Sequence, residues 1–185
     1  MKKLILASRS PRRKELLGLL GYDFDVIVSD VSESVNEDLS PVELVKTLAY
    51  QKAIAVFEKH SHDVVLGCDT IVVVDDEILG KPKNQGQAKE MMLKMKNREH
   101  QVITGVAILS EEKKIVFSNT SVVHFNDIAE KEIDEYIKTP EPYDKAGGYA
   151  IQGWAARYIS AIEGNFYTIM GLPLDQVFEN LNKLL

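Results

Sequence analysis

The stretch VVLGCDTIVVV, residues 64–74, predicts a long buried strand, because β-branched and other apolar residues fill most of it. Asp69 interrupts this pattern, and a buried carboxylate is costly unless it meets a cation, a metal ion or hydrogen-bond donors. Asp69 is therefore either a functional residue or a strand-end aspartate bonded to a nearby loop. The two-residue period puts Gly67 on the same face as Asp69, where a ligand could approach the backbone.

The segments before this strand carry clear helix-start signals. A short apolar strand at 4–7 leads to Ser10 and Pro11, which suit the N-cap and the first position of a helix ending at Gly21. Alternation predicts a strand over 24–28. The run Ser40-Pro41-Val42-Glu43 is a capping box that opens a second helix, which extends to about residue 60.

The segments after residue 74 mix helices with hairpins. We expect an acidic turn at 75–76, a return strand at 78–79 and a helix capped by Asn84. Strands at 101–109 and 114–125 and a helix near 130–138 follow. The chain then forms a hairpin of 157–162 with 166–170 and a last helix from Pro173 to about residue 185. This order predicts an α/β fold with a mixed sheet flanked by helices.

Composition limits the class of protein. A chain of 185 residues suits one domain, here 1–185. The net charge of -6 argues against a nucleic-acid partner, and an anionic ligand then needs a local basic cluster. Cys68, the single cysteine, excludes an internal disulfide framework and a cysteine-rich zinc site. No apolar run approaches the ~20 residues that cross a bilayer, and the apolar start is too short for a signal-peptide core. We expect a soluble, cytoplasmic protein with no membrane partner.

Lys52 is out of place on the second predicted helix. Val45, Ala49, Lys52 and Val56 are spaced by four, three and four residues, so they share one helical stripe. A lysine in an apolar stripe either extends its ammonium group to the surface or points it into an anion site within the fold.

The run Ser8-Arg9-Ser10-Pro11-Arg12-Arg13 is the strongest basic feature. Here a strand leads into a helix whose first turn offers free N–H groups and the positive end of the helix dipole. Arginine adds forked donors that match phosphate oxygens. A solvated basic first turn is the alternative, but cations at a helix N-terminus are unfavourable unless an anion joins them. The run therefore favours a phosphate site.

Three further polar residues give weaker signals. Lys81 and Glu33 lie in polar loops, where exposure to solvent is the default. Gln152 follows a glycine-rich stretch, and an amide can pair with the donor and acceptor edge of a nucleobase. The four histidines lack metal-ligand spacing, so we interpret them as structural or surface residues.

Together these segments resemble the Maf family of nucleotide pyrophosphatases, which is related in fold to the ITP pyrophosphatases. The matching motifs, in family order, are residues 8–17, 51–53, 67–70, 79–82, 102–106, 144–147, 151–153 and 170–173. They span essentially the whole chain. Cys68 and Gly148 stand where alanine is common in the family, and neither change removes a chemical group.

The resemblance implies a function and a set of site residues. The expected reaction is hydrolysis of dTTP and UTP, and of modified pyrimidine nucleotides, to the monophosphate and pyrophosphate, a house-cleaning activity in a central cleft. The implied roles are Asp69 as general base; Ser8, Arg13, Lys52 and Lys81 as phosphate ligands; Arg12, Thr70 and Gln152 as specificity residues; and Glu33 with Asp69 as ligands of Mg²⁺ or Mn²⁺. A homodimer is compatible with the family.

Three rival functions stay open at this point. One is a nucleotide-binding regulator of septum formation that needs no turnover. Another is a pyrophosphatase for 7-methyl-GTP, although that branch is expected to carry Trp, Gln and Glu at positions 12, 70 and 152. The last is a nucleic-acid-binding module that uses the basic residues Arg9, Arg12, Arg13 and Lys14. The acidic net charge argues against it.

Overall fold

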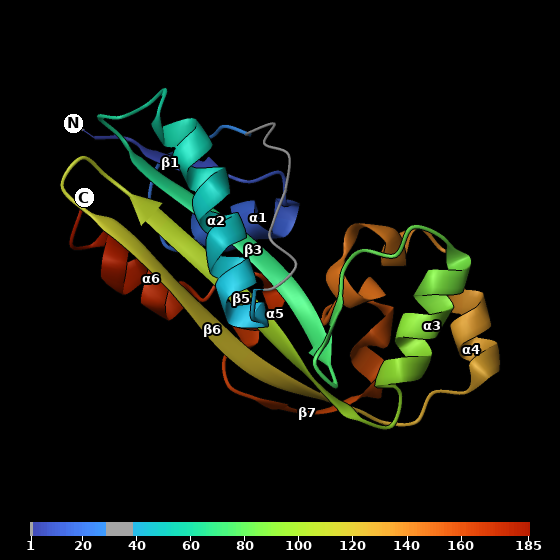
Figure 1. Cartoon of the computed structure of the whole chain (residues 1–185). Helices are drawn as coiled ribbons and strands as arrows, with labels where there is room; N and C mark the ends of the chain where they lie inside the picture. Colours follow the sequence, from blue (N-terminus) through green and yellow to red (C-terminus); the bar gives the residue numbers. More distant parts are fainter. Residues whose placement is uncertain (1, 29–38) are drawn as a thin grey trace. The chain divides into compact units, whose positions relative to one another are not determined.

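The computed structural model describes residues 2–28 and 39–185 of the chain (Figure 1). Its strands are β1 (Leu4–Ala7), β2 (Phe24–Val26), β3 (Val64–Val74), β4 (Glu77–Leu79), β5 (Glu99–Leu109), β6 (Lys114–Phe125) and β7 (Ile159–Glu163). Its α-helices are α1 (Pro11–Gly18), α2 (Pro41–Phe57), α3 (Gln85–Met95), α4 (Glu130–Tyr136), α5 (Phe166–Met170) and α6 (Leu174–Leu181). Three 3₁₀ helices are η1 (Glu141–Asp144), η2 (Ala146–Gly148) and η3 (Trp154–Tyr158).

The strands form one mixed sheet in the order β2-β1-β3-β5-β6-β7, with β4 paired to β3. β1 runs parallel to both β2 and β3. β4 is antiparallel to β3, and β7 is antiparallel to β6. The predicted α/β fold with a mixed sheet and flanking helices is therefore confirmed.

Contacts gather the chain into two compact units. Unit 1 comprises residues 1–70, 104–119 and 170–185, and unit 2 comprises 71–103 and 120–169. The single domain over 1–185 stays a prediction.

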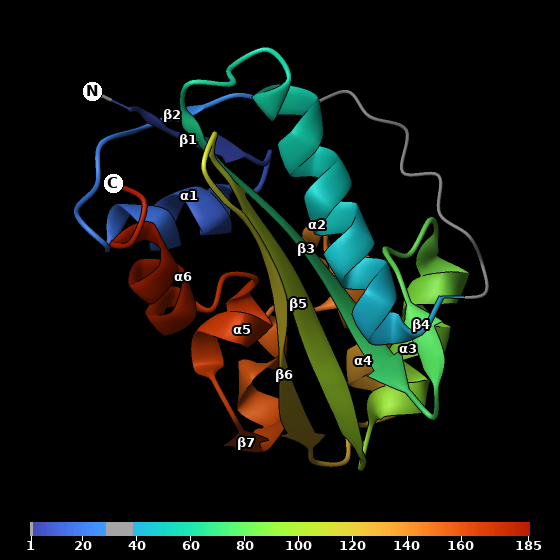
Figure 2. The same ribbon diagram turned by 60° about the vertical axis from the view of Figure 1, so that its left-hand side comes forward.

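Unit 1 is built around the close approach of α2 to the sheet (Figure 2). The capping box predicted at Ser40 is present: its side chain accepts from the backbone N–H of Glu43, and the Glu43 side chain accepts from the Ser40 N–H. Alanines and branched side chains from α2, β1, β3 and β5 form the core beneath the helix. Because small residues line this contact, the helix backbone comes very near the strands.

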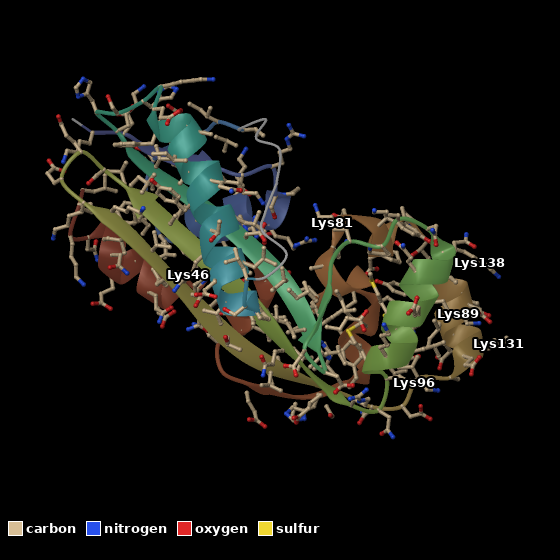
Figure 3. All side chains as sticks on the ribbon, in the orientation of Figure 1. Lys46, Lys81, Lys89, Lys96, Lys131 and Lys138 are labelled. Atoms are coloured by element: carbon tan, nitrogen blue, oxygen red, sulfur yellow. The ribbon has the colours of Figure 1, made fainter. Side chains whose placement is uncertain are left out.

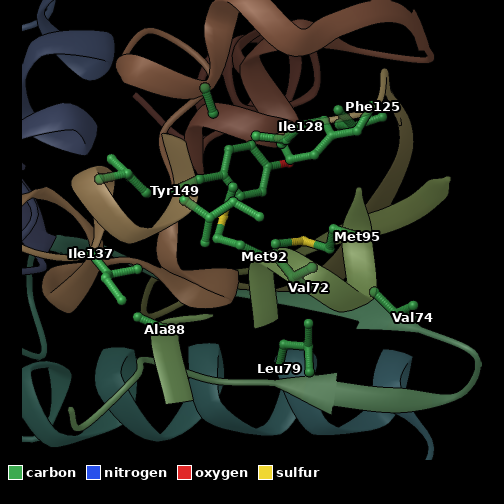
Figure 4. Close-up of a cluster of buried hydrophobic side chains, with 14 of the residues drawn as sticks. Val72, Val74, Leu79, Ala88, Met92, Met95, Phe125, Ile128, Ile137 and Tyr149 are labelled. Atoms are coloured by element: carbon green, nitrogen blue, oxygen red, sulfur yellow. The ribbon is translucent and has the colours of Figure 1, made fainter. Parts of the chain in front are cut away.

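Unit 2 has its own core, which Figure 4 shows around Tyr149 and the methionines of α3. Helices α3 and α4 lie side by side (Figure 1), and Lys89 donates to Asp134 between them at 2.6 Å. His100 is part of this core, 2.6 Å from the Tyr149 hydroxyl through Nε2. Burial lowers the pKa of His100 to about 4, so the ring is neutral near pH 7. The structural role expected for this histidine is confirmed.

Several predicted elements end elsewhere in the structure, such as the last helix, which ends at Leu181 and not near residue 185, and one predicted pairing is wrong. The first helix ends at Gly18, although Gly21 does adopt the left-handed backbone expected of it, with φ 76°. The hairpin of 157–162 with 166–170 is wrong, because β7 pairs with β6 and residues 166–170 form α5. Asn165 explains the helix: its side chain accepts from the N–H of Tyr167, and its own N–H donates to Ser121 on β6.

Among residues 2–28 and 39–185, no helix is both long enough and apolar enough to cross a membrane.

Candidate active site

Two candidate residues, Ser8 and Asp69, lie just beyond the point where the parallel pairing of β1 with β3 ends. Ala7, the last residue of β1, pairs with Gly67 of β3. Ser8 follows directly after β1, and Asp69 lies two residues beyond Gly67. Open α/β sheets bind ligands outside the carboxyl ends of their strands. The sheet thus places two predicted site residues where this fold offers a ligand site.

Asp69 contacts a cation, which offsets the free-energy cost of burying a carboxylate in an apolar strand. Lys52 Nζ donates to Asp69 Oδ1 at 2.5 Å, from the face of β3 that α2 covers. The side chains of Lys52 and Asp69 are 19% and 13% exposed, so both stay accessible to a ligand. Lys52 therefore does not simply extend to the surface; its ammonium group holds the carboxylate in one orientation.

The expected ligand approach at Gly67 is wrong. A Cβ atom built there would lie 2.4 Å from the carbonyl oxygen of Ala49 and 2.8 Å from the backbone nitrogen of Ala53. The space beside Gly67 therefore belongs to α2. The glycine brings the helix close enough for Lys52, one turn on from Ala49, to reach Asp69.

Arg13 is held at three points in the first turn of α1. Its Nε donates to the carbonyl of Gly171 at 2.9 Å, Nη2 donates to Thr70 Oγ1 at 2.9 Å, and Nη1 donates to Ser8 Oγ at 3.3 Å. The helix starts as predicted, with the Ser10 side chain accepting from the Arg13 N–H. Three of the phosphate and specificity candidates, Ser8, Arg13 and Thr70, are thus brought together.

Two partners of this cluster were missed in the sequence. The hydroxyl of Thr104 lies 2.9 Å from that of Thr70. Gly171 supplies the carbonyl that orients Arg13. The available signals were a threonine within the apolar run of β5 and a glycine in the motif at 170–173, but neither shows which residue it contacts. Both roles depend on segments that only the tertiary structure brings together.

Two neighbours complete this part of the site. Arg12 lies half-buried in the first turn of α1, beside Arg13. Cys68 is buried next to Asp69, and burial raises the pKa of its thiol to about 11. The thiol is therefore protonated near pH 7 and is not an activated nucleophile.

Lys81 and Gln152 belong to unit 2. Lys81 is exposed on the connection between β4 and α3 (Figure 3), directly after Gly80, whose carbonyl accepts from the N–H of Gly147 at 3.0 Å. Gln152 is exposed in a turn closed by a hydrogen bond from the N–H of Gly153 to the carbonyl of Ala150, 3.0 Å long. Both side chains are free of the core and accessible to a ligand.

The Glu141 carboxylate anchors the turn that carries Gln152. Its Oε1 accepts from the backbone N–H of Trp154 at 3.0 Å and from the Tyr136 hydroxyl at 3.3 Å. The same hydroxyl lies 3.0 Å from the carbonyl oxygen of Gly148, so its single hydrogen is shared between the two acceptors. One carboxylate thus ties the residue after Gly153 to the core of unit 2.

Gly153→Ala is expected to release this anchor. The added Cβ would stand 1.9 Å from Glu141 Oε1, so the carboxylate must leave and its bonds to Trp154 and Tyr136 are lost. We expect a loss of about 1–2 kcal/mol in the free energy of unfolding, measured by urea denaturation. Glu141→Gln keeps an acceptor oxygen and is expected to lose less. An unchanged unfolding midpoint in Gly153→Ala would show that the anchor contributes nothing.

Glu33, the predicted metal ligand, lies outside the described residues. Within residues 2–28 and 39–185, no group of three or more histidine, cysteine, aspartate or glutamate side chains has the arrangement of a metal site.

The fold and this geometry define a class of protein: an α/β enzyme with a carboxylate–lysine pair and an anchored arginine, suited to a phosphorylated ligand. The Maf-like protein family matches residues 3–184. The chain therefore belongs to the Maf family, as its motifs predicted.

Similar proteins agree with this assignment. A dTTP/UTP pyrophosphatase of Bacillus cytotoxicus is 49% identical over 183 residues, which cover 99% of this chain and 96% of that protein. The dTTP/UTP pyrophosphatase of Bacillus mycoides is 48% identical with the same coverage. The structure of the Staphylococcus aureus Ham1 protein aligns over 98% of this chain and 99% of its own, with a TM-score of 0.52 and 14% identity. At that identity the likeness supports the fold alone.

Proposed function

We propose that the protein hydrolyses dTTP and UTP to the nucleoside monophosphate and pyrophosphate. The observation that carries this proposal is the Lys52–Asp69 pair on β3, directly beside Thr70, which ties Arg13 to the same strand. The high identity to proteins named dTTP/UTP pyrophosphatase supports the choice of substrate.

In this proposal Asp69 is the general base. A water molecule attacks the α–β phosphoanhydride, its proton passes to a carboxylate oxygen of Asp69, and the anhydride P–O bond breaks to release pyrophosphate. Lys52 orients the carboxylate through the 2.5 Å bond. A positioned base of this kind contributes about 10²–10⁴-fold to a rate.

The cationic and polar residues share the binding of the nucleotide. Ser8, Arg13, Lys52 and Lys81 bind the triphosphate, whose spread negative charge suits forked guanidinium and ammonium donors. Arg12, Thr70 and Gln152 select the base. Gln152 has an exposed amide with both a donor and an acceptor for a pyrimidine edge.

The residues fit a divalent cation that is bound mainly through substrate. Mg²⁺ typically takes one or two protein carboxylates, with substrate phosphates and waters as its other ligands. Asp69 is the carboxylate available in the described part of the site, and Glu33 is the second proposed ligand. When bound, Mg²⁺ or Mn²⁺ would neutralise phosphate charge as a Lewis acid.

The remaining parts of the proposal rest on the length and composition of the chain and on the family resemblance. They are a single domain over 1–185 with a central cleft, a cytoplasmic location, a homodimer, and no nucleic-acid or membrane partner. The physiological role is removal of unwanted pyrimidine nucleotides.

Product analysis tests the proposed function. Purified protein is incubated with dTTP, UTP or 7-methyl-GTP, each with Mg²⁺, with Mn²⁺ or with EDTA, and the products are separated by ion exchange. We expect monophosphate and pyrophosphate from dTTP and UTP, in the presence of metal only. Diphosphate and phosphate would place cleavage at the wrong bond. A preference for 7-methyl-GTP would overturn the substrate assignment, and nucleotide binding without turnover would favour a regulatory binder.

A further inference from the structure

Thr104 is a buried hydroxyl in an apolar strand. Residues 102–109 of β5 are all buried, and Thr104 has an exposed fraction of 0%. Burying a hydroxyl without a partner is costly, and Thr104 Oγ1 lies 2.9 Å from Thr70 Oγ1. A valine would fill the same space in the strand without this cost. The hydroxyl therefore calls for an explanation beyond packing.

Thr70 connects this buried hydroxyl to Arg13. Its Oγ1 accepts from Arg13 Nη2 at 2.9 Å while it contacts Thr104 Oγ1. A threonine hydroxyl has one hydrogen and two lone pairs, so it can serve both neighbours at once. The contact with Thr104 fixes the direction of the Thr70 hydroxyl, and the Thr70 hydroxyl in turn fixes one end of the guanidinium group.

The anchors leave Arg13 part of its bonding capacity. The contacts with Gly171, Thr70 and Ser8 use three of the five guanidinium N–H groups within the described part of the chain. One N–H on each terminal nitrogen then remains for a phosphate oxygen. Because its contacts already hold the Arg13 guanidinium group in one orientation, the group loses less conformational entropy when it binds phosphate.

Asp69 and Thr70 leave opposite faces of β3, as consecutive strand residues do. Asp69 points to Lys52 on α2, whereas Thr70 points to Arg13 on α1. Thr104 belongs to the Arg13 side of the strand. A change at Thr104 can therefore act on Arg13 without touching the Lys52–Asp69 pair.

We propose that Thr104 is a positioning residue, whose buried hydroxyl holds Thr70 so that Thr70 aligns Arg13 for the triphosphate. Thr70 then acts through its hydroxyl on Arg13 in addition to any contact with the base. The inference rests on the proposed function for the role of Arg13 in phosphate binding.

The test compares Thr104→Val, which deletes the hydroxyl, with Thr104→Ser, which keeps it. KM and kcat are measured with dTTP and UTP, and the affinity for tripolyphosphate is measured by calorimetry. For Thr104→Val we expect KM to rise and tripolyphosphate affinity to fall, each about fivefold, as for the loss of one hydrogen bond. We expect kcat to change by less than about twofold, and Thr104→Ser to restore most of the affinity.

A double-mutant cycle separates positioning from packing. Because Thr104 acts through Thr70, adding Thr104→Val to Thr70→Val is expected to weaken binding little further. Thr168→Val, at another fully buried threonine, is the control and is expected to keep the KM of the parent protein. Should Thr104→Val fail to fold, Thr104→Ala also removes the hydroxyl, together with the Cγ2 methyl group, and places no methyl group in the position of the hydroxyl beside Thr70.

The outcomes are distinct. A folded Thr104→Val protein with parental KM and tripolyphosphate affinity overturns the inference, as do additive effects with Thr70→Val or a failure of Thr104→Ser to rescue. Failure of the proposed function looks different: the parent protein itself would release no monophosphate and pyrophosphate, while the tripolyphosphate titrations would still report on Arg13.

Discussion

Asp69→Asn is expected to lower kcat with dTTP by about 10²–10⁴-fold while the protein stays folded. Asparagine has the same shape, and its side-chain oxygen can still accept from Lys52 Nζ, which the carboxylate contacts at 2.5 Å. The amide cannot take a proton from water near neutral pH, so the general base is lost. Steady-state release of pyrophosphate measures the effect, and circular dichroism verifies the fold.

Asp75→Asn is the matched control for this result. Asp75 follows the end of β3 and pairs with Arg98 at 2.5 Å on the surface. Its replacement removes one carboxylate close in sequence to Asp69 and is expected to leave turnover unchanged. Near-normal turnover in folded Asp69→Asn would show that another group, or no protein group, takes the proton.

Gly105→Ala is expected to give the largest loss of stability. An added Cβ would stand 2.2 Å from the carbonyl oxygen of Val45 and 2.8 Å from the backbone nitrogen of Lys46. These are backbone atoms of α2, so no side-chain rotation relieves the clash and the helix must move away from the sheet. We expect a loss of about 3 kcal/mol or more in the free energy of unfolding, measured by urea denaturation.

The same displacement should reach the active site. α2 also carries Lys52, so lifting the helix lengthens the Lys52–Asp69 contact and is expected to lower turnover in the fraction that folds. Gly18→Ala, at the end of α1, is the control: apart from the adjoining residues and the backbone of its own helix, no atom of the described residues lies within 4 Å of the added Cβ, and stability should change by less than about 0.5 kcal/mol. Equal unfolding midpoints in the two variants would refute the role of Gly105.

Local signals predicted most of the elements. The caps at Ser10, Ser40 and Asn84 all form, because each needs only a side chain and backbone N–H groups within three residues. The strand at 64–74 has the predicted bounds, since its composition suits a buried strand. The hairpin failed at 166–170, where a short apolar run does not distinguish strand from helix.

The sequence identified the candidate residues, because each breaks the pattern of its segment, but it did not predict which of them contact one another. Asp69 stood out because a carboxylate in an apolar strand requires a partner. That the partner is Lys52, 17 residues earlier, depends on how close α2 comes to β3. Gly67 shows the difference most clearly, because its missing side chain makes room for that helix and not for a ligand.

The sequence by itself determined the helix caps, the long strand, the unusual placement of Asp69 and Lys52, and membership of the Maf family. The tertiary structure alone decided that Arg13 is anchored by Gly171, 158 residues away, and that Thr104 supports Thr70. The physical reason is the distance along the chain between the interacting residues. Caps and strand patterns depend on neighbours in the chain, whereas a hydrogen bond between distant segments depends on strand register and on how closely the helices pack against the sheet.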